Sequence, residues 1–470
     1  MEKSSGSKGL GKLDFFLGML CIIFFVDTVA PMSAMGVTSI TWALIIAVIF
    51  YVPSGMITAE LATTYPEEGG MYAWVKRAYG KRWGARISYL YWVNNAIWTA
   101  SVATFFVGLM SSLFFPNLPF VAMLGLMLVC IWAIIFISMR SVDESKWLIN
   151  ITTIVKLSIG LGLILSAVAY LVMNGSPANT FSWAEMKPSL SQSLTFMPAL
   201  IYNFLGFEAV MTLATHMKNP KKDIPRITIF SSILVASIYI ITSIALLIII
   251  PVGEINLVTG IMDAFFAVLG GSIIGKTVIF IVGILFLFTI LTQTSSYLVA
   301  ACRMAAAASD DGELPKIFGK RHKNHDTPVG GLWIIGIVGT VLVVIYGIMA
   351  STAEDLFWTF FSFVSVIYLV TFIINYQAYT KLQKTDTETE RPFSFPGPKI
   401  LGRFFAHLCQ GILIVTIILF FWVPGYGIDW SYTIPLLIGI TLALVVGELL
   451  TYTSLKKIQK LEKLESRGKK

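Results

Sequence analysis

The chain has 470 residues, of which 56% are hydrophobic and only 13% are charged, and its mean hydropathy is +0.79. This composition excludes an ordinary soluble globular protein, because such a protein needs far more polar surface. The net charge of +8 does not indicate a nucleic-acid partner, since the basic residues are distributed over alternate loops. The four cysteines lie far apart without metal-ligand spacing, and we expect them to be buried and unpaired.

Apolar stretches long enough to cross a bilayer recur along the whole chain. A transmembrane β-barrel is excluded, because its segments would be shorter and would alternate in polarity. The N-terminal run is not a cleaved signal, since it is long, contains Asp27 and is followed by further spans. We therefore predict an all-α polytopic membrane protein with about 12 transmembrane helices, at 14–37, 40–65, 84–112, 119–138, 147–173, 194–216, 227–252, 276–305, 329–349, 353–380, 405–424 and 432–455.

Lysine and arginine concentrate in alternate loops and in the tail at 456–470, whereas the intervening loops are nearly free of them apart from Lys187. Positive charge accumulates on the cytoplasmic side of membrane proteins. The pattern therefore predicts a multi-pass protein of the cell membrane with both termini in the cytoplasm. The basic tail would be solvated or lie on the lipid surface.

Residues 24–36, FFVDTVAPMSAMG, interrupt the first apolar span. Pro31 cannot donate a hydrogen bond to the carbonyl of Asp27, four residues earlier. That carbonyl then needs a partner from a side chain, water or a ligand. A simple kink would explain Pro31 but not the neighbouring carboxylate, so we favour a substrate-binding role for this segment.

The sixth span carries a similar interruption, YNFLGFEAV, at residues 202–210. Gly206 allows the backbone to open there. Glu208 would bind a substrate ammonium group, take part in proton coupling, or stabilise the break through a neighbouring helix. Interrupted helices at corresponding places in two halves suggest an inverted repeat with a central binding site, with spans 1 and 6 unwound. The spans then group as a first repeat at 14–173, a second repeat at 194–380 and two added helices at 405–455, between cytoplasmic tails at 1–13 and 456–470.

Five other polar positions stand out in the apolar spans. Lys156 in the fifth span is either a snorkelling lysine or a buried ammonium group that takes up and releases a proton. Asn95 in the third span would line the pathway or tie helices together. Thr294 and Ser295 in the eighth span offer hydroxyls that would face Lys156 or a cation. Glu60, near the cytoplasmic end of the second span, is expected to be structural.

Several functional signatures are absent from the sequence. There is no phosphate-binding glycine loop, no metal-spaced cluster of histidine and cysteine, and no pair of nucleophile and base. We therefore expect neither a cofactor nor an enzymatic activity, and no ATP-driven pump.

Four segments resemble the amino acid–polyamine–organocation (APC) transporters. The second span and following loop, SGMITAELATTYPEEGGMYAWVKRAYGKRWG (54–84), the fifth span, VDESKWLINITTIVKL (142–157), and the sixth span, GFEAVMTLATHMKNPKKDIPR (206–226), are similar to their counterparts in that superfamily. The segment IPVGEINLVTGIMDAFFAVLG (250–270) is similar to the bacterial glutamate/γ-aminobutyrate antiporters. The common Gly-Ser-Gly cradle of the first span is missing, as it is in those antiporters.

The resemblance implies two inverted five-helix repeats plus two helices that work by alternating access. It implies that the unwound parts of spans 1 and 6 bind the substrate through backbone groups. It also implies that Lys156 takes the place of a sodium ion between spans 1, 5 and 8, in many members with proton coupling. The short basic tail lacks a histidine-containing plug, so we do not carry over acid gating.

These observations give a predicted site and function. Substrate contacts are expected from Asp27, Thr28, Val29, Ala30, Asn95, Tyr202, Asn203, Gly206, Phe207 and Glu208, and coupling from Lys156, Thr294 and Ser295. Two acids against one lysine favour neutral or cationic amino acids, or the amines made from them by decarboxylation.

We expect a secondary active transporter that works as an antiporter. A proton-coupled uptake symporter, with protons as partners, and a non-transporting ligand sensor are the alternatives. The expected partners are a small amino acid or amine and the lipid bilayer, without nucleic acid. The protein is expected to be a monomer or a homodimer.

Overall fold

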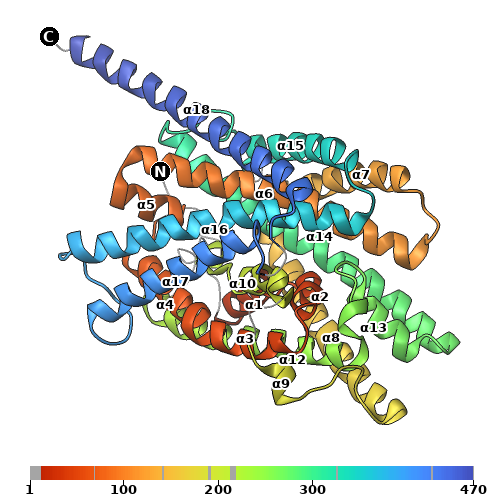
Figure 1. Cartoon of the computed structure of the whole chain (residues 1–470). Coiled ribbons are helices and arrows are strands. Elements are labelled where there is room, and N and C mark those ends of the chain that lie inside the picture. Colours follow the sequence, from red (N-terminus) through yellow and green to blue (C-terminus); the bar gives the residue numbers. More distant parts are fainter. Residues whose placement is uncertain are drawn as a thin grey trace.

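The computed structural model describes residues 12–67, 69–139, 142–188, 192–211, 219–323, 326–424 and 427–468. Within these ranges every regular element is a helix, and the long helices lie side by side (Figure 1). Eleven helical segments of the described chain are long and apolar enough to cross a membrane. The predicted all-α polytopic architecture is thereby confirmed.

The spanning segments follow the predicted order. The first five are formed by α1 (Lys12–Ile23) with η1 (Val26–Thr28) and α2 (Val29–Ser33), α3 (Thr38–Ile46) with the π-helical η2 (Ala47–Tyr51) and α4 (Val52–Thr64), α6 (Lys81–Phe114), α7 (Phe120–Ser138) and α8 (Val142–Asn174). The later ones are α12 (Pro220–Ile249), α14 (Ile273–Asp310), α15 (Val329–Gly347), α16 (Ala353–Thr385), α17 (Lys399–Leu419) and α18 (Trp430–Gly468).

Short helices join these spans. They are α5 (Met71–Tyr79), α9 (Trp183–Met186), η3 (Gln192–Phe196), α10 (Met197–Asn203), α11 (Phe207–Met211), η5 (Val252–Glu254) and α13 (Gly260–Leu269). The predicted sixth span corresponds to η3, α10 and α11, and its last residues, 212–216, lie outside the described ranges. It is therefore not one of the eleven long segments.

Burial divides the helices into an inner and an outer set. The first span is 89% buried over its apolar window, whereas the corresponding window of α18 is only 22% buried. Both are apolar, so the exposed faces of the outer helices suit contact with hydrocarbon and not with water. The inner helix α6 packs against α14, α15 and α16, and this places the first span and α10 at the centre of the bundle (Figure 1).

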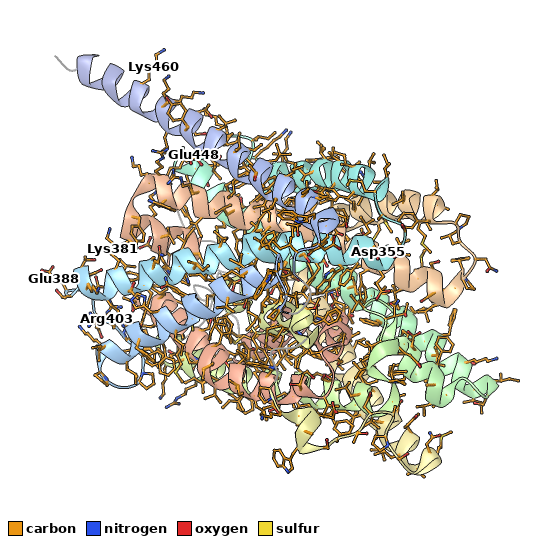
Figure 2. All side chains as sticks on the ribbon, viewed as in Figure 1. Asp355, Lys381, Glu388, Arg403, Glu448 and Lys460 are labelled. Carbon is orange, nitrogen blue, oxygen red and sulfur yellow. The ribbon has the colours of Figure 1, made fainter. Side chains whose placement is uncertain are left out.

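The two ends of the bundle carry different labelled residues in Figure 2. Lys381, Arg403 and Lys460 lie at one end, together with Glu388 and Glu448, and we call it the basic end; Asp355 lies toward the other, which we call the opposite end. At the basic end the wholly buried carboxylate of Glu60 is bound by Arg391 at 2.9 Å and by the backbone N–H of Phe395 at 2.8 Å. The contact with Arg391, an arginine in the loop after α16, therefore supports the expected structural role of Glu60.

Candidate functional site

The first span is broken between α1 and η1. Helix α1 ends at Ile23, and Phe24 and Phe25 are not helical. The hydroxyl of Tyr239, from α12, accepts a hydrogen bond from the Phe25 N–H at 2.7 Å and donates one to the Ile23 carbonyl at 3.1 Å. A side chain from another helix thus satisfies backbone groups that the break leaves without helical partners.

Lys156 binds the same break from the side of α8. Its ammonium group is 1% exposed and donates to the carbonyl oxygens of Cys21 and Phe24, each at 2.7 Å. It also donates to the side-chain oxygen of Gln293, whose amide in turn donates to the Ile22 carbonyl at 3.1 Å. This lysine is a buried cation that joins α1, α8 and α14, and it does not snorkel to the surface.

Asp27 lies in η1, next to the lysine, and is 5% exposed. Its charge interacts with that of Lys156, although among the described residues no ion pair within 4.0 Å joins them. Pro31 lies inside α2, in the first turn of a helix, where its missing N–H costs little. The interruption therefore precedes Pro31, and Asp27 lies in η1, the short helix that follows the interruption and begins at Val26.

The break in the sixth span faces the first one. Gly206 has a φ of +114°, in the left-handed region that favours glycine, and a Cβ there would lie 2.6 Å from the hydroxyl of Tyr297. That hydroxyl donates to the Ile22 carbonyl at 3.2 Å. Asn203 donates to the Thr28 carbonyl at 3.3 Å, and its side-chain oxygen has no hydrogen-bond partner in the described chain.

Glu208 follows this second break and is 1% exposed. One carboxylate oxygen accepts hydrogen bonds from Tyr91, at 3.1 Å, and from Tyr368. The other oxygen has no hydrogen bond of good geometry among the described residues, although the backbone N–H groups of Gly206 and Glu208 lie near the carboxylate. A buried carboxylate oxygen without a donor is costly, so a ligand that supplies a donor would be stabilised there.

Aromatic rings gather around Tyr202, which is buried and within electrostatic range of both Asp27 and Glu208. Its ring packs against Phe361 at 5.0 Å and Tyr368 at 5.4 Å between centroids. Aromatic faces flanked by carboxylates suit an organic cation better than an organic anion.

The remaining predicted substrate contacts are dispersed around this centre. Ala30 lies against Gly260, and the ring of Phe207 stacks on Tyr51 at 4.9 Å. Asn95 donates to the Tyr91 carbonyl of its own helix at 2.9 Å, a contact that supports neither a pathway role nor a tie between helices. Two further predicted positions, Thr28 and Val29, are buried, with Thr28 donating to the Phe25 carbonyl and Val29 accepting from Ser33.

The two predicted coupling hydroxyls do not contact Lys156. Thr294 donates to the Ile290 carbonyl of its own helix at 2.8 Å, and Ser295 lies 3.1 Å from the hydroxyl of Ser138 in α7. Gln293, their neighbour, makes the contact instead. It stands in the same polar run, but nothing in the sequence shows which face of α14 meets α8.

A helical membrane protein with two broken spans that meet at buried acids, a buried lysine and unpaired polar atoms has the construction of a secondary transporter. Residues 15–445 match the family described as amino acid permease, and the chain belongs to that family. The resemblance to the APC superfamily is thus confirmed, as is the expectation of a transporter and not an enzyme.

Three relatives illustrate the range of the family. The chain is 34% identical to the "Probable agmatine/putrescine antiporter AguD" of Lactococcus lactis subsp. lactis, over 95% of each chain. It is 23% identical to the "Glutamate/gamma-aminobutyrate antiporter" of the same organism, over 75% of this chain and 71% of the relative. It is 25% identical to "Solute carrier family 7 member 12" of Mus musculus, over 62% of each chain.

Proposed function

We propose that the protein is an antiporter that exchanges organic amines, or an amino acid for the amine made from it, by alternating access. The observation that carries this proposal is the buried carboxylate of Glu208, which keeps one oxygen without a well-formed hydrogen bond among the described residues. An ammonium or guanidinium group would supply the missing donor and the missing positive charge.

The charge balance favours a substrate with two cationic groups. Lys156 is already bound to two carbonyls and Gln293, so its donors are used within the protein. Asp27 and Glu208 then remain as two buried acids within electrostatic range of Tyr202. A linear diamine or guanidinoamine would place one cation near each acid and its alkyl chain against the aromatic rings. The name of the most completely covered of the three relatives supports the same substrate class.

The two broken spans form the centre of the mechanism. We infer that residues 14–173 and 194–380 form the two inverted repeats, with Lys156 in the position that a coupling cation would hold between α1, α8 and α14. Substrate would bind through Asp27, Asn203 and Glu208. We propose that each subunit holds a complete site and that the protein works as a monomer or a homodimer.

Orientation follows from the basic end. The positive-inside rule places that end, with Lys381, Arg403 and Lys460, in the cytoplasm and Asp355 outside (Figure 2). The protein would then lie in the cell membrane with both termini inside.

Counterflow in proteoliposomes tests the proposal. Vesicles loaded with unlabelled putrescine should take up external labelled agmatine, and empty vesicles should take up little. Uptake into empty vesicles that follows an imposed proton gradient would instead support the proton-coupled symporter, for which the buried ammonium of Lys156 is the motivating feature. Exchange of neutral amino acids without any amine would contradict the proposed substrate class.

A further inference from the structure

A cavity of about 740 Å³ lies at the opposite end, apart from the central site. Its walls come from the start of α16, the end of α15, the residues before α10 and the α17–α18 connection. Asp355, which lines it, is labelled in Figure 2. None of its lining residues is one of the polar side chains of the central site. The volume is in the range that small organic ligands need, and far larger than a single metal ion requires.

The lining is acidic without a compensating base. Glu354, Asp355 and Asp429 contribute carboxylates, and no lysine, arginine or histidine is among the lining residues that the structure describes. Glu354 accepts hydrogen bonds from Asn256 and from the Leu257 N–H, both of which are neutral donors. A hydrogen bond from the Ser431 side chain lowers the pKa of Asp429, so this acid stays ionised at neutral pH. Three like charges on one concave surface give it a negative potential, which attracts cations.

Aromatic rings provide the apolar part of the wall. The ring of Trp358 packs edge-on against Phe196, with centroids 5.3 Å apart, and stacks on Phe361 at 5.5 Å. Phe361 in turn packs against Tyr202 of the central site. Trp358 and Phe361 thus form a continuous aromatic connection from the cavity to Tyr202. The combination of aromatic faces with carboxylates is the chemistry that recognises organic ammonium and guanidinium groups.

Thr433 supplies an independent observation that points to a ligand. It lines the cavity and is 3% exposed, yet its hydroxyl has no hydrogen-bond partner in the described part of the chain. Buried hydroxyls are normally satisfied, so this one has capacity for a partner that the protein does not provide.

We propose that this cavity is an outer binding site for an organic cation with an alkyl chain, which the substrate occupies before it reaches the central site. The identity of the cation rests on the proposed function, whereas the existence of the site rests on the cavity itself. A purely inorganic cation would not use the aromatic wall.

Equilibrium binding of labelled putrescine to the full chain in lipid nanodiscs tests this site. The Glu208→Gln background weakens the central site, so the part of the remaining binding that depends on Asp355 reports on the outer site. Adding Asp355→Asn should weaken this remaining binding about threefold, the scale of one partly exposed charge pair. Trp358→Leu should weaken it further, and unchanged elution on size exclusion shows that each variant is folded. Glu254→Gln is the matched control, because this exposed acid of η5 does not line the cavity and should leave binding unchanged.

Two results would overturn the outer site. One is that Glu208→Gln abolishes all putrescine binding. The other is that the remaining binding is insensitive to Asp355→Asn, or responds equally to Glu254→Gln. The proposed function is judged separately by counterflow with the unsubstituted protein. If exchange fails but binding that depends on Asp355 persists, the outer site stands and the proposed function falls.

Discussion

The hydroxyl oxygen of Tyr297 comes very close to the position at which residue 206 would carry a Cβ atom. The distance to that ideal position is 2.6 Å, and the φ of Gly206 is +114°. Two constraints therefore require glycine at this position: the backbone conformation and the approach of a tyrosine that also binds the first break.

Gly206→Ala should lower both the Tm and the exchange rate of the protein. Left-handed backbone costs a residue with a Cβ about 1–2 kcal/mol, and the contact with Tyr297 adds to this. Gly175→Ala is the matched control, since Gly175 has a φ of +75° but open space around its Cβ position. Thermal melts of the purified protein compare the two. Equal losses in both variants would show that the contact with Tyr297 contributes nothing.

Lys156→Ala should abolish exchange or remove its dependence on pH. The substitution deletes a buried cation and leaves the carbonyls of Cys21 and Phe24 without their donor, at about 1–3 kcal/mol for each unsatisfied group. Exchange rates measured between pH 5 and 9 test this. Lys276→Ala, at an exposed lysine of α14, is the control and should behave as the unsubstituted protein. Unchanged kinetics across this pH range would exclude Lys156 from the mechanism.

Glu208→Gln should impair dicationic substrates more than neutral amino acids. Removing one partner of a buried charge pair typically costs 2–5 kcal/mol, so we expect at least a tenfold rise in KM for putrescine or agmatine. Asp27→Asn should act in the same direction, because the second cation would lose its carboxylate. Competition against a labelled amine, with neutral and cationic compounds side by side, provides the measurement. Equal effects on both classes would make these acids structural.

An ion-pair network at the basic end should make stability depend on pH. Lys76 in α5 lies 2.7 Å from Asp311 and 2.8 Å from Glu313, just beyond α14. Burial opposes ionisation of Asp311, but its hydrogen bonds with Lys76 and Tyr72 outweigh this, and the pKa of Asp311 is lowered. Burial also opposes ionisation of Lys76 and so lowers its pKa. Hydrogen bonds to the two acids outweigh burial, and the pKa of Lys76 is raised.

The sign of the effect follows from these directions. The lowered pKa of Asp311 contributes stability above its unfolded value of about 4, which is lost as pH falls further. The raised pKa of Lys76 contributes stability up to about pH 10, which is lost as pH rises through the folded value. Glu313 acts in the opposite sense, because burial raises its pKa in spite of Lys76 and Tyr72. The Tm difference between the unsubstituted protein and Lys76→Gln should therefore be largest between about pH 5 and 9 and shrink below about pH 4. Lys316→Gln, at an exposed lysine, is the control. A difference that persists at pH 3 would contradict the pairing.

The spans and the charged residues of the site could both be predicted from the sequence, because both stand out against the alternatives. A long apolar run has few alternatives to a membrane helix, and a single charge such as Lys156 or Glu208 within it is conspicuous. Tyr239, Tyr297 and Gln293 were missed because tyrosine and glutamine are common in the spans, and their roles depend on which helices meet. Adjacent residues of a helix differ by about 100° in direction, so Gln293 can face Lys156 while Thr294 turns back to its own backbone.

The contact between Glu60 and Arg391 has a mechanical consequence. Its partners tie α4 to the last turns of α16 and to the loop that follows, through Tyr379, Gln383, Arg391 and Phe395. Separating a wholly buried carboxylate from its arginine is strongly unfavourable. A conformational change that opens a passage to the basic end must therefore do one of two things. It either hydrates this carboxylate, or it moves α4 and the end of α16 together as one rigid unit. In the second case the opening movement must be absorbed elsewhere, at the breaks between α1 and α2 and between α10 and α11.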